Sequence, residues 1–144
     1  MKTADFTCSI TANITAEEAM KAISRVSHWW AKDVTGSTEK LNDEFTVRFG
    51  ETFVDFKITE FVPGSKIVWA VTNSYLPWLK DKTEWTNTRV IFELNADDNL
   101  TTINFTHLGL VPQVECYDTC VAGWAKYIPG SLQKLLNDGV GQPA

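Results

Sequence analysis

The sequence predicts an α+β domain in which a curved antiparallel sheet of about six strands packs against one long C-terminal helix. Three observations indicate this fold class. Residues 5–13 alternate apolar and polar, two short helical segments follow, and the alternation returns over residues 43–110. The final apolar stripe, over residues 115–137, has helical spacing. Helices segregated from an antiparallel sheet are typical of the α+β class.

The N-terminal strand and the two short helices are indicated by alternation and by capping residues. The segment DFTCSITAN, residues 5–13, has the period of two that a half-buried strand requires. Thr15 is placed to cap a helix, and Glu18 follows three residues later, which is the pattern of a capping box. Ser27 is placed to cap a second short helix, and the turn-favouring residues DVTGS, 33–37, are expected to end it.

Three further strands are expected at residues 44–50, 52–62 and 66–72, because each alternates apolar and polar side chains. Segment 73–85 then interrupts the meander, and it is longer than a typical hairpin connection. It is unusually rich in aromatic and apolar residues. It could therefore cover a pocket as a lid, present an adhesive patch to another protein, or simply pack against the sheet edge.

The last two strands, residues 87–95 and 100–110, are joined by the turn ADDN. Their apolar faces match, so that His107 shares a face with apolar residues. The helix that follows, residues 115–137, is expected to bend at Pro129, which lacks a backbone donor, and to remain one helix. Its apolar stripe consists of Cys116, Cys120, Trp124, Ile128, Leu132 and Leu135.

A twisted sheet of about six strands curls as it grows, so its concave face touches a long helix closely in some places and parts from it in others. The gap between them is a natural place for a ligand pocket. We therefore expect the candidate site between the sheet and the C-terminal helix.

Four stretches of this chain resemble a known superfamily: ITAEEAMKAISRVSHWWA, FVPGSKIVWAV, TRVIFELNADDNLTTINFTHLGL and GWAKYIPGSLQKLL. The chain is similar to the START-like, polyketide-cyclase (SRPBCC) superfamily, and within it to the C-terminal domain of the activator of heat-shock protein 90 ATPase. The resemblance spans nearly the whole chain. It implies a helix-grip fold with a hydrophobic cavity, which different relatives use to bind lipids or other apolar molecules, to shape polyketide cyclisation, or to dock a chaperone.

Length, charge and composition limit the partners and locations that we expect for this protein. The 144 residues suit one domain, 1–144, with a tail, 138–144, that we expect to be flexible. A net charge of −5 without basic runs argues against nucleic acid and anionic membranes as partners. No apolar run is long enough to span a membrane, and the N-terminus lacks a signal-peptide core, so we expect a cytoplasmic protein. The three cysteines are expected to be reduced thiols.

Two neighbouring tryptophans, Trp29 and Trp30, cannot both point into one ordinary core, because adjacent residues diverge on a helix and on a strand. One could pack on the sheet edge or the first helix while the other faces the cavity mouth. Alternatively, both could close the end of the sheet, since large aromatic side chains usually serve packing.

His107, Cys116 and Cys120 form the one cluster with possible chemistry. They could contribute part of a soft metal site, but a fourth ligand is missing. They could act as nucleophile and base, but such a pair needs a third residue to orient it. The favoured interpretation is a hydrogen-bonded wall histidine beside buried thiols. No metal, no cofactor and no catalytic residue is therefore predicted.

The sequence favours a module that binds a small apolar or amphipathic molecule. A protein-interaction domain that modulates a chaperone ATPase is the alternative that the resemblance implies, and a cyclase- or hydrolase-type enzyme using His107 is the third hypothesis. The few ionisable groups on the inward faces disfavour the enzyme. The predicted ligand-binding residues are Trp30, Phe56, Trp69, Trp78, Phe105, His107, Cys120, Trp124 and Ile128.

Overall fold

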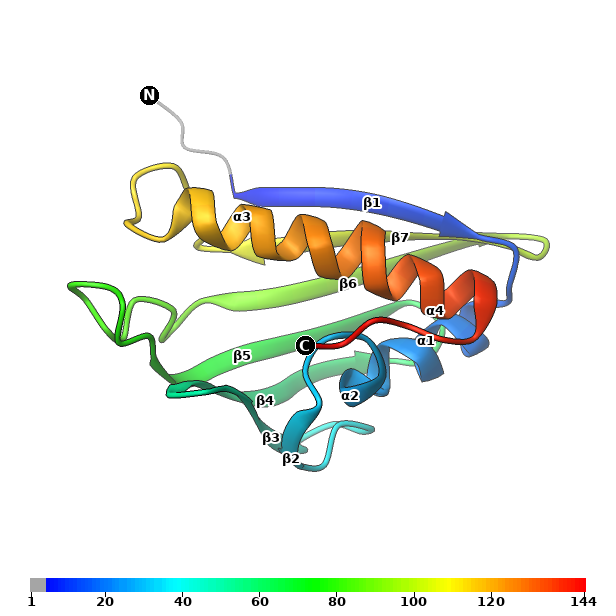
Figure 1. Ribbon diagram of the computed structural model, residues 1–144. Helices are drawn as coiled ribbons and strands as arrows, with labels where there is room; N and C mark the ends of the chain where they lie inside the picture. The colour runs from blue at the N-terminus through cyan, green and yellow to red at the C-terminus, as the bar shows by residue number, and fades with distance from the viewer. Residues whose placement is uncertain (1–4) are drawn as a thin grey trace.

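A computed structural model describes residues 5–144 and has the predicted α+β, helix-grip architecture. Figure 1 shows the long C-terminal helix lying across one face of a curved sheet, with the two short helices near the helix C-terminus. In chain order the elements are β1 (Phe6–Ala12), α1 (Ala16–Ser24), α2 (Val26–Trp29), β2 (Asp33–Gly36), β3 (Glu44–Phe49), β4 (Thr52–Val62), β5 (Lys66–Tyr75), β6 (Arg89–Asp97), β7 (Leu100–Leu108), α3 (Tyr117–Lys126), η1 (Tyr127–Leu132) and α4 (Gln133–Asp138).

The strands form one antiparallel sheet in the order β1-β7-β6-β5-β4-β3-β2. The expected match between the last two strands is confirmed: Val90 pairs with His107, and Phe92 pairs with Phe105. Register shifts interrupt the pairing of β4 with β5 next to Phe56 and Ile58. Such irregularities bend a strand and increase its twist, which helps the sheet to curve around the helix.

The sheet has seven strands where about six were expected, because DVTGS forms an edge strand and not only a turn. β2 pairs with β3, and Val34 lies opposite Val47. Gly36, at φ +98°, permits this close approach: a Cβ there would stand 2.3 Å from the carbonyl oxygen of Glu44. Pairing with a neighbouring strand therefore overrides the local turn preference.

The capping prediction holds for the first short helix and fails for the second. The Thr15 hydroxyl accepts a hydrogen bond from the Glu18 backbone N–H at 3.1 Å and caps α1. The second helix, α2, begins at Val26, so Ser27 lies inside it and caps nothing. The chain turns into α2 directly from α1 through Arg25, which leaves no room for an extended capping residue.

The C-terminal helix is continuous over α3, η1 and α4, as predicted. Its middle turn, η1, is π-helical and contains Pro129. Proline cannot donate a backbone hydrogen bond, and a widened turn accommodates this loss without ending the helix. All six residues of the predicted stripe are buried, namely Cys116, Cys120, Trp124, Ile128, Leu132 and Leu135.

The tail after α4 folds back along α2. The Gln142 backbone N–H donates to the Ser131 hydroxyl, and Ala144 exchanges backbone hydrogen bonds with Trp30 and Lys32. These bonds connect the tail to the C-terminal helix and to the segment after α2, and the expected flexibility of residues 138–144 stays a prediction. Within residues 5–144, none of the helices combines the length and the apolar character that crossing a membrane requires.

Candidate functional site

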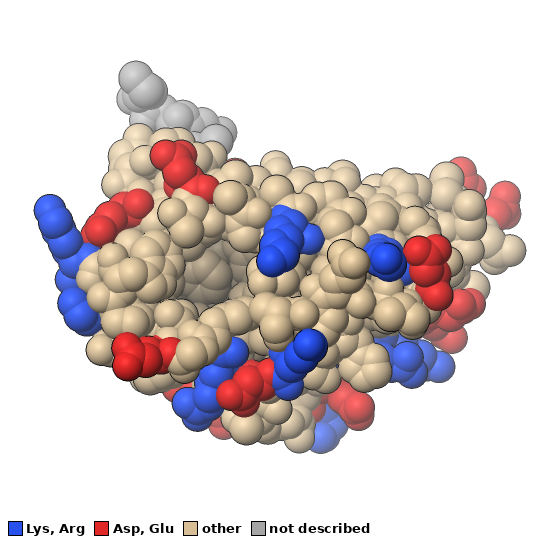
Figure 2. Space-filling view, viewed as in Figure 1, with Lys and Arg blue, Asp and Glu red and all other residues tan. Residues whose placement is uncertain are grey.

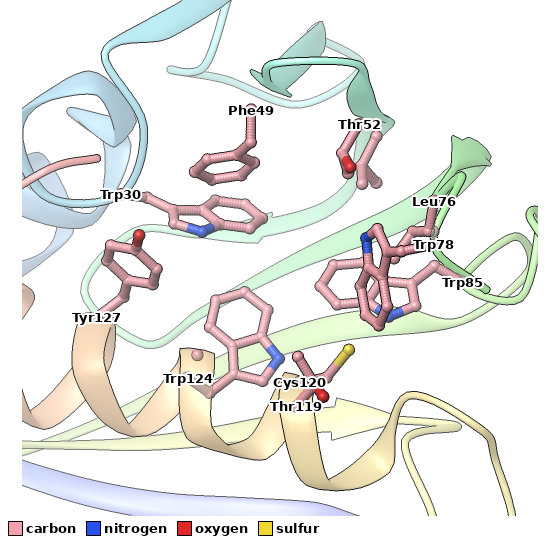
Figure 3. A pocket seen from close by; sticks show the side chains of 12 residues that line it. Trp30, Phe49, Thr52, Leu76, Trp78, Trp85, Thr119, Cys120, Trp124 and Tyr127 are labelled. Carbon is pink, nitrogen blue, oxygen red and sulfur yellow. The ribbon is translucent and has the colours of Figure 1, made fainter.

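The candidate site is a pocket of about 350 Å³ at the end of the sheet where α3 begins. Its walls come from α3, the β3–β4 turn, and the connection 76–88 between β5 and β6. Figure 3 shows Trp30, Phe49 and Tyr127 together at one end, Leu76, Trp78 and Trp85 at the other, and Trp124 between them. The complete lining is Trp30, Phe49, Thr52, Val54, Leu76, Trp78, Trp85, Thr119, Cys120, Gly123, Trp124 and Tyr127.

The pocket is apolar and opens to the surface. Figure 2 shows a hollow whose walls are uncharged, with lysine, arginine and acidic side chains around its margin. Six of its lining residues are aromatic, and none is Lys, Arg, His, Asp or Glu. A volume of this size and such walls are typical of small-molecule sites. The environment therefore suits the apolar part of a ligand and would penalise a buried charge.

Connection 76–88 is fastened to the start of α3 by carboxylates. The Glu84 side chain accepts hydrogen bonds from the backbone N–H groups of Glu115 and Cys116, at 2.7 and 3.2 Å. The Glu115 carboxylate in turn accepts one from the backbone N–H of Lys80, at 3.0 Å. Backbone N–H groups at a helix start have no helical partner, and an anion there is favoured. The connection therefore forms a wall of the pocket that is hydrogen-bonded to the start of α3, while the lid, the adhesive patch and the packing against the sheet edge expected for segment 73–85 stay predictions.

His107 lies behind the pocket, fully buried, and both of its ring nitrogens are engaged. The indole N–H of Trp124 donates to Nδ1 at 3.0 Å, and Nε2 lies 2.9 Å from the Thr88 hydroxyl. An indole nitrogen can only donate, so Nδ1 is an acceptor and the proton resides on Nε2. The Thr88 hydroxyl in turn donates a hydrogen bond to the carbonyl oxygen of Trp85 at 2.6 Å. Donors and acceptors are thus fully matched.

This network determines what His107 can do. Burial lowers the pKa of His107 to about 3, so the ring is neutral at physiological pH. With Nδ1 occupied by Trp124 and Nε2 protonated, no lone pair remains to accept a substrate proton or bind a metal. His107, which lies in β7, therefore connects that strand to α3 through Trp124 and to connection 76–88 through Thr88, and it does not line the pocket.

The two helical cysteines are buried on the inner side of α3. The indole N–H of Trp85 donates to the Cys116 sulfur at 3.3 Å. The hydrogen bond with Cys120 lowers the pKa of Cys116, and the same bond together with burial raises the pKa of Cys120. Across residues 5–144, the structure contains no group of three or more His, Cys, Asp and Glu side chains able to hold a metal ion.

Trp29 and Trp30 stack on each other at 6.1 Å, and both stack on Trp69. Trp29 is fully buried, and its indole N–H donates to the carbonyl of Ile23 at 3.1 Å. Trp30 forms the inner wall of the pocket and packs against Trp124 at 4.9 Å between ring centroids. Trp29 thus packs under the first helix, whereas Trp30 lies on the inner wall of the pocket and not at its mouth, so the pair matches neither expectation in full.

The structure divides the nine predicted ligand-binding residues into two groups. Trp30, Trp78, Cys120 and Trp124 line the pocket. The other five belong to the packed interior and do not line it, namely Phe56, Trp69, Phe105, His107 and Ile128. Alternation predicts which face of a strand a residue occupies, but it does not tell whether another side chain covers that face.

Sequence reasoning missed several lining residues. Trp85 and Leu76 lie in the connection whose aromatic content was noted, and that content was the available signal. Gly123 is the most informative omission. It lies in the middle of α3, where a glycine costs about 1 kcal/mol relative to alanine. A Cβ at this position would meet nothing within 4 Å, so the glycine faces open space in the pocket.

Comparisons with solved structures establish the fold. The chain is similar to the Aha1 dimer from Colwellia psychrerythraea, known from a solution structure, with a TM-score of 0.77 and 23% identity over 96% of this chain and 99% of that chain. It is also similar to SSP2350 from Staphylococcus saprophyticus, with a TM-score of 0.71 and 14% identity over 96% of each chain.

Two further similar structures are CalU16 and DynU16. CalU16 from Micromonospora echinospora matches with a TM-score of 0.64 and 10% identity, over 88% of this chain and 73% of that chain. DynU16, a protein of the dynemicin biosynthetic locus, matches with a TM-score of 0.67 and 17% identity, over 94% of this chain and 48% of that chain. No model of a known protein family and no curated protein matches the sequence. These likenesses show the fold alone, and it is the helix-grip fold that the resemblance implies.

Proposed function

We propose that this protein binds a small apolar or amphipathic molecule in the pocket between α3, the β3–β4 turn and connection 76–88. The observation that carries the proposal is a pocket of about 350 Å³ walled by six aromatic side chains. Contiguous apolar surface of this kind is costly to leave in water, and a bound molecule would cover it.

Gly123 supports the same proposal independently. Any larger residue would fill part of the pocket, and alanine would stabilise the helix. A helical glycine that gives up this stability and packs against nothing is what an open binding site requires. Fold likeness by itself adds no information about the ligand, because one fold carries many functions.

Native mass spectrometry of the freshly purified protein tests the proposal. We expect a co-purifying molecule that departs on denaturation, or, in stripped protein, saturable binding of the neutral fluorophore N-phenyl-1-naphthylamine. The variant Gly123→Leu places a side chain in the pocket and should weaken fluorophore binding at least tenfold. Ala125→Leu is the matched control, because Ala125 is exposed on the same helix. Equal binding by the two variants would contradict the proposed site.

A second candidate function is an interaction with a chaperone, supported by the likeness to the Aha1 dimer over nearly the whole of both chains. In this case the chain would bind purified heat-shock protein 90 and change its ATPase rate. A pull-down combined with the ATPase assay distinguishes the candidates. If the protein neither associates with heat-shock protein 90 nor changes its ATPase rate, the chaperone interaction is excluded. The small-molecule proposal is not affected by that result.

A further inference from the structure

The shape of the pocket goes further than its apolar character and specifies a class of ligand. We propose that the pocket takes a compact aromatic molecule with an uncharged inner part, and not an extended acyl chain. This inference rests on the proposed binding function. It follows from the inner wall, the side walls and the notch at Gly123, which are considered in turn.

The inner wall is solid. The ring centroid of Trp30 lies 4.9 Å from that of Trp124 and 6.3 Å from that of Trp69. The planes of Trp30 and Trp69 differ by only 7°. Trp29 lies beyond, in contact with Trp69 and Phe92. The space between sheet and helix past Trp30 is therefore filled. A long chain following the helix axis would have to displace buried indole rings, whereas a compact molecule would not.

The side walls favour flat rings. Phe49 and Tyr127 lie at one end of the pocket, while Trp78 and Trp85 lie at the other (Figure 3). Contacts between aromatic rings are more favourable than the burial of apolar area alone accounts for. A rigid ring also loses no internal rotations on binding. A flexible chain in the same space would gain less and would lose conformational freedom.

Charge is confined to the margin. The side-chain polar groups of the lining are the hydroxyls of Thr52, Thr119 and Tyr127, the thiol of Cys120 and the indole N–H groups of its four tryptophans, of which those of Trp85 and Trp124 donate to Cys116 and His107. The Lys126 ammonium stands over the ring of Tyr127, a lining residue, at 5.4 Å. A hydroxyl or carbonyl on the ligand would find partners here, and any charged group would have to remain at the mouth.

Gly123 completes the shape. Its missing side chain leaves a notch in α3 next to Trp124, and a ring edge can approach the helix backbone there. A single notch of this kind widens the pocket locally and does not lengthen it. The widening therefore suits a broad molecule and gives an extended one no additional room.

The test compares 2-naphthol with the linear alcohols from 1-hexanol to 1-dodecanol, using the full chain and the indole N–H signals of Trp30, Trp85 and Trp124 in NMR titrations. In an acyl tunnel each added CH₂ would tighten binding about fourfold. We expect affinity to stop rising within the series because Trp30 blocks the chain. We also expect 2-naphthol to bind at least tenfold more tightly than 1-heptanol.

Two results would overturn the inference: an affinity that keeps rising to 1-dodecanol, or 2-naphthol binding no more tightly than 1-heptanol. Both would leave the proposed binding function standing, because the pocket would still be occupied. If neither 2-naphthol nor any alcohol shifts the three indole signals, the proposed function falls together with the inference. Gly123→Ala narrows the notch and should weaken the binding of 2-naphthol more than the binding of 1-heptanol. This difference separates an effect of pocket shape from a general loss of binding.

Discussion

The two ends of the space between sheet and helix differ although both are built from aromatic side chains. At the closed end, Trp29 and Trp30 reach down onto Trp69 and fill the gap. At the open end, Trp85 and Trp124 stack on each other at 5.9 Å, yet a pocket of about 350 Å³ remains beside them. Aromatic composition alone therefore does not decide whether a region is filled or hollow.

The difference lies in what covers each end. The closed end is covered by a short helix, α2, that follows α1 directly, with one indole on its last residue, Trp29, and the adjacent indole on its C-cap residue, Trp30. The open end is covered by connection 76–88, whose Glu84 is hydrogen-bonded to the start of α3. A cover held at its margin can span a gap without filling it, because its anchoring bonds lie outside the pocket.

The largest expected effect distinguishes the two ends by stability. Trp69→Ala removes a fully buried ring from the closed end and should lower the free energy of unfolding by about 3–5 kcal/mol. Trp78→Ala removes a ring that is 49% exposed at the open end and should change it by less than about 0.5 kcal/mol. Urea denaturation measures both. Equal losses would show that the ends do not differ in packing.

The second expectation concerns the histidine behind the open end. The folded pKa of His107, about 3, lies below the unfolded value, about 6.5. Between these values the unfolded chain binds the proton and the folded chain does not, so stability falls as the pH drops from 6.5 towards 3. From pH 7 to pH 5 the loss due to His107 should be about 2 kcal/mol.

Urea denaturation at several pH values measures this loss as the difference in pH dependence between the wild type and His107→Gln. The variant has no titrating ring at this position. The contributions of all other titrating groups to the pH dependence are the same in both proteins and cancel in the difference. An identical pH dependence in both proteins would show that His107 is not held neutral by the fold.

The third expectation concerns the anchor of the cover. Glu84→Gln removes the negative charge at the start of α3 and should lower the free energy of unfolding by about 1 kcal/mol. Hydrogen exchange at the amides of Glu115 and Cys116 should accelerate. Asp118→Asn is the control, because Asp118 lies in the same helical turn without a hydrogen bond to the connection among the residues described. Equal acceleration in both variants would attribute the effect to the helix alone.

The smallest expected effect has the opposite sign. Gly123→Ala should stabilise the protein by about 0.5–1 kcal/mol, since alanine favours the helix and its methyl group meets nothing. Binding of N-phenyl-1-naphthylamine should weaken at the same time. Ala125→Gly, on the exposed face, should lower stability by a similar amount and leave binding unchanged. A Gly123→Ala protein that is more stable and binds equally well would show that the notch is not used.

Much of the fold is predictable because it depends on repeated patterns. Alternation over many residues located the strands, and six apolar positions at helical spacing located the buried stripe of the last helix. The edge strand β2 escaped prediction, since its four residues favour turns and become a strand only by pairing with β3. β2 is a strand only because it pairs with β3, and the residues of β2 alone do not indicate that pairing.

The site was predictable only in part. Trp30, Trp78, Cys120 and Trp124 line the pocket, whereas Phe56, Trp69 and Phe105 are buried in the packed interior, and ligand binding by any of them stays a prediction. His107 was correctly placed on the inner face, but its partners Trp124 and Thr88 could not be inferred. Which ring covers which depends on side-chain packing across elements, and spacing along one element carries no information about it.

The sequence by itself determined the order of the elements, the inward faces of the strands and the helix, and the uncharged character of the space between them. Only the tertiary structure decided that one end of this space is filled by stacked indoles and that the other is hollow. The physical reason is that periodicity records which face of each element avoids water, while a cavity is the volume left after several such faces have packed together.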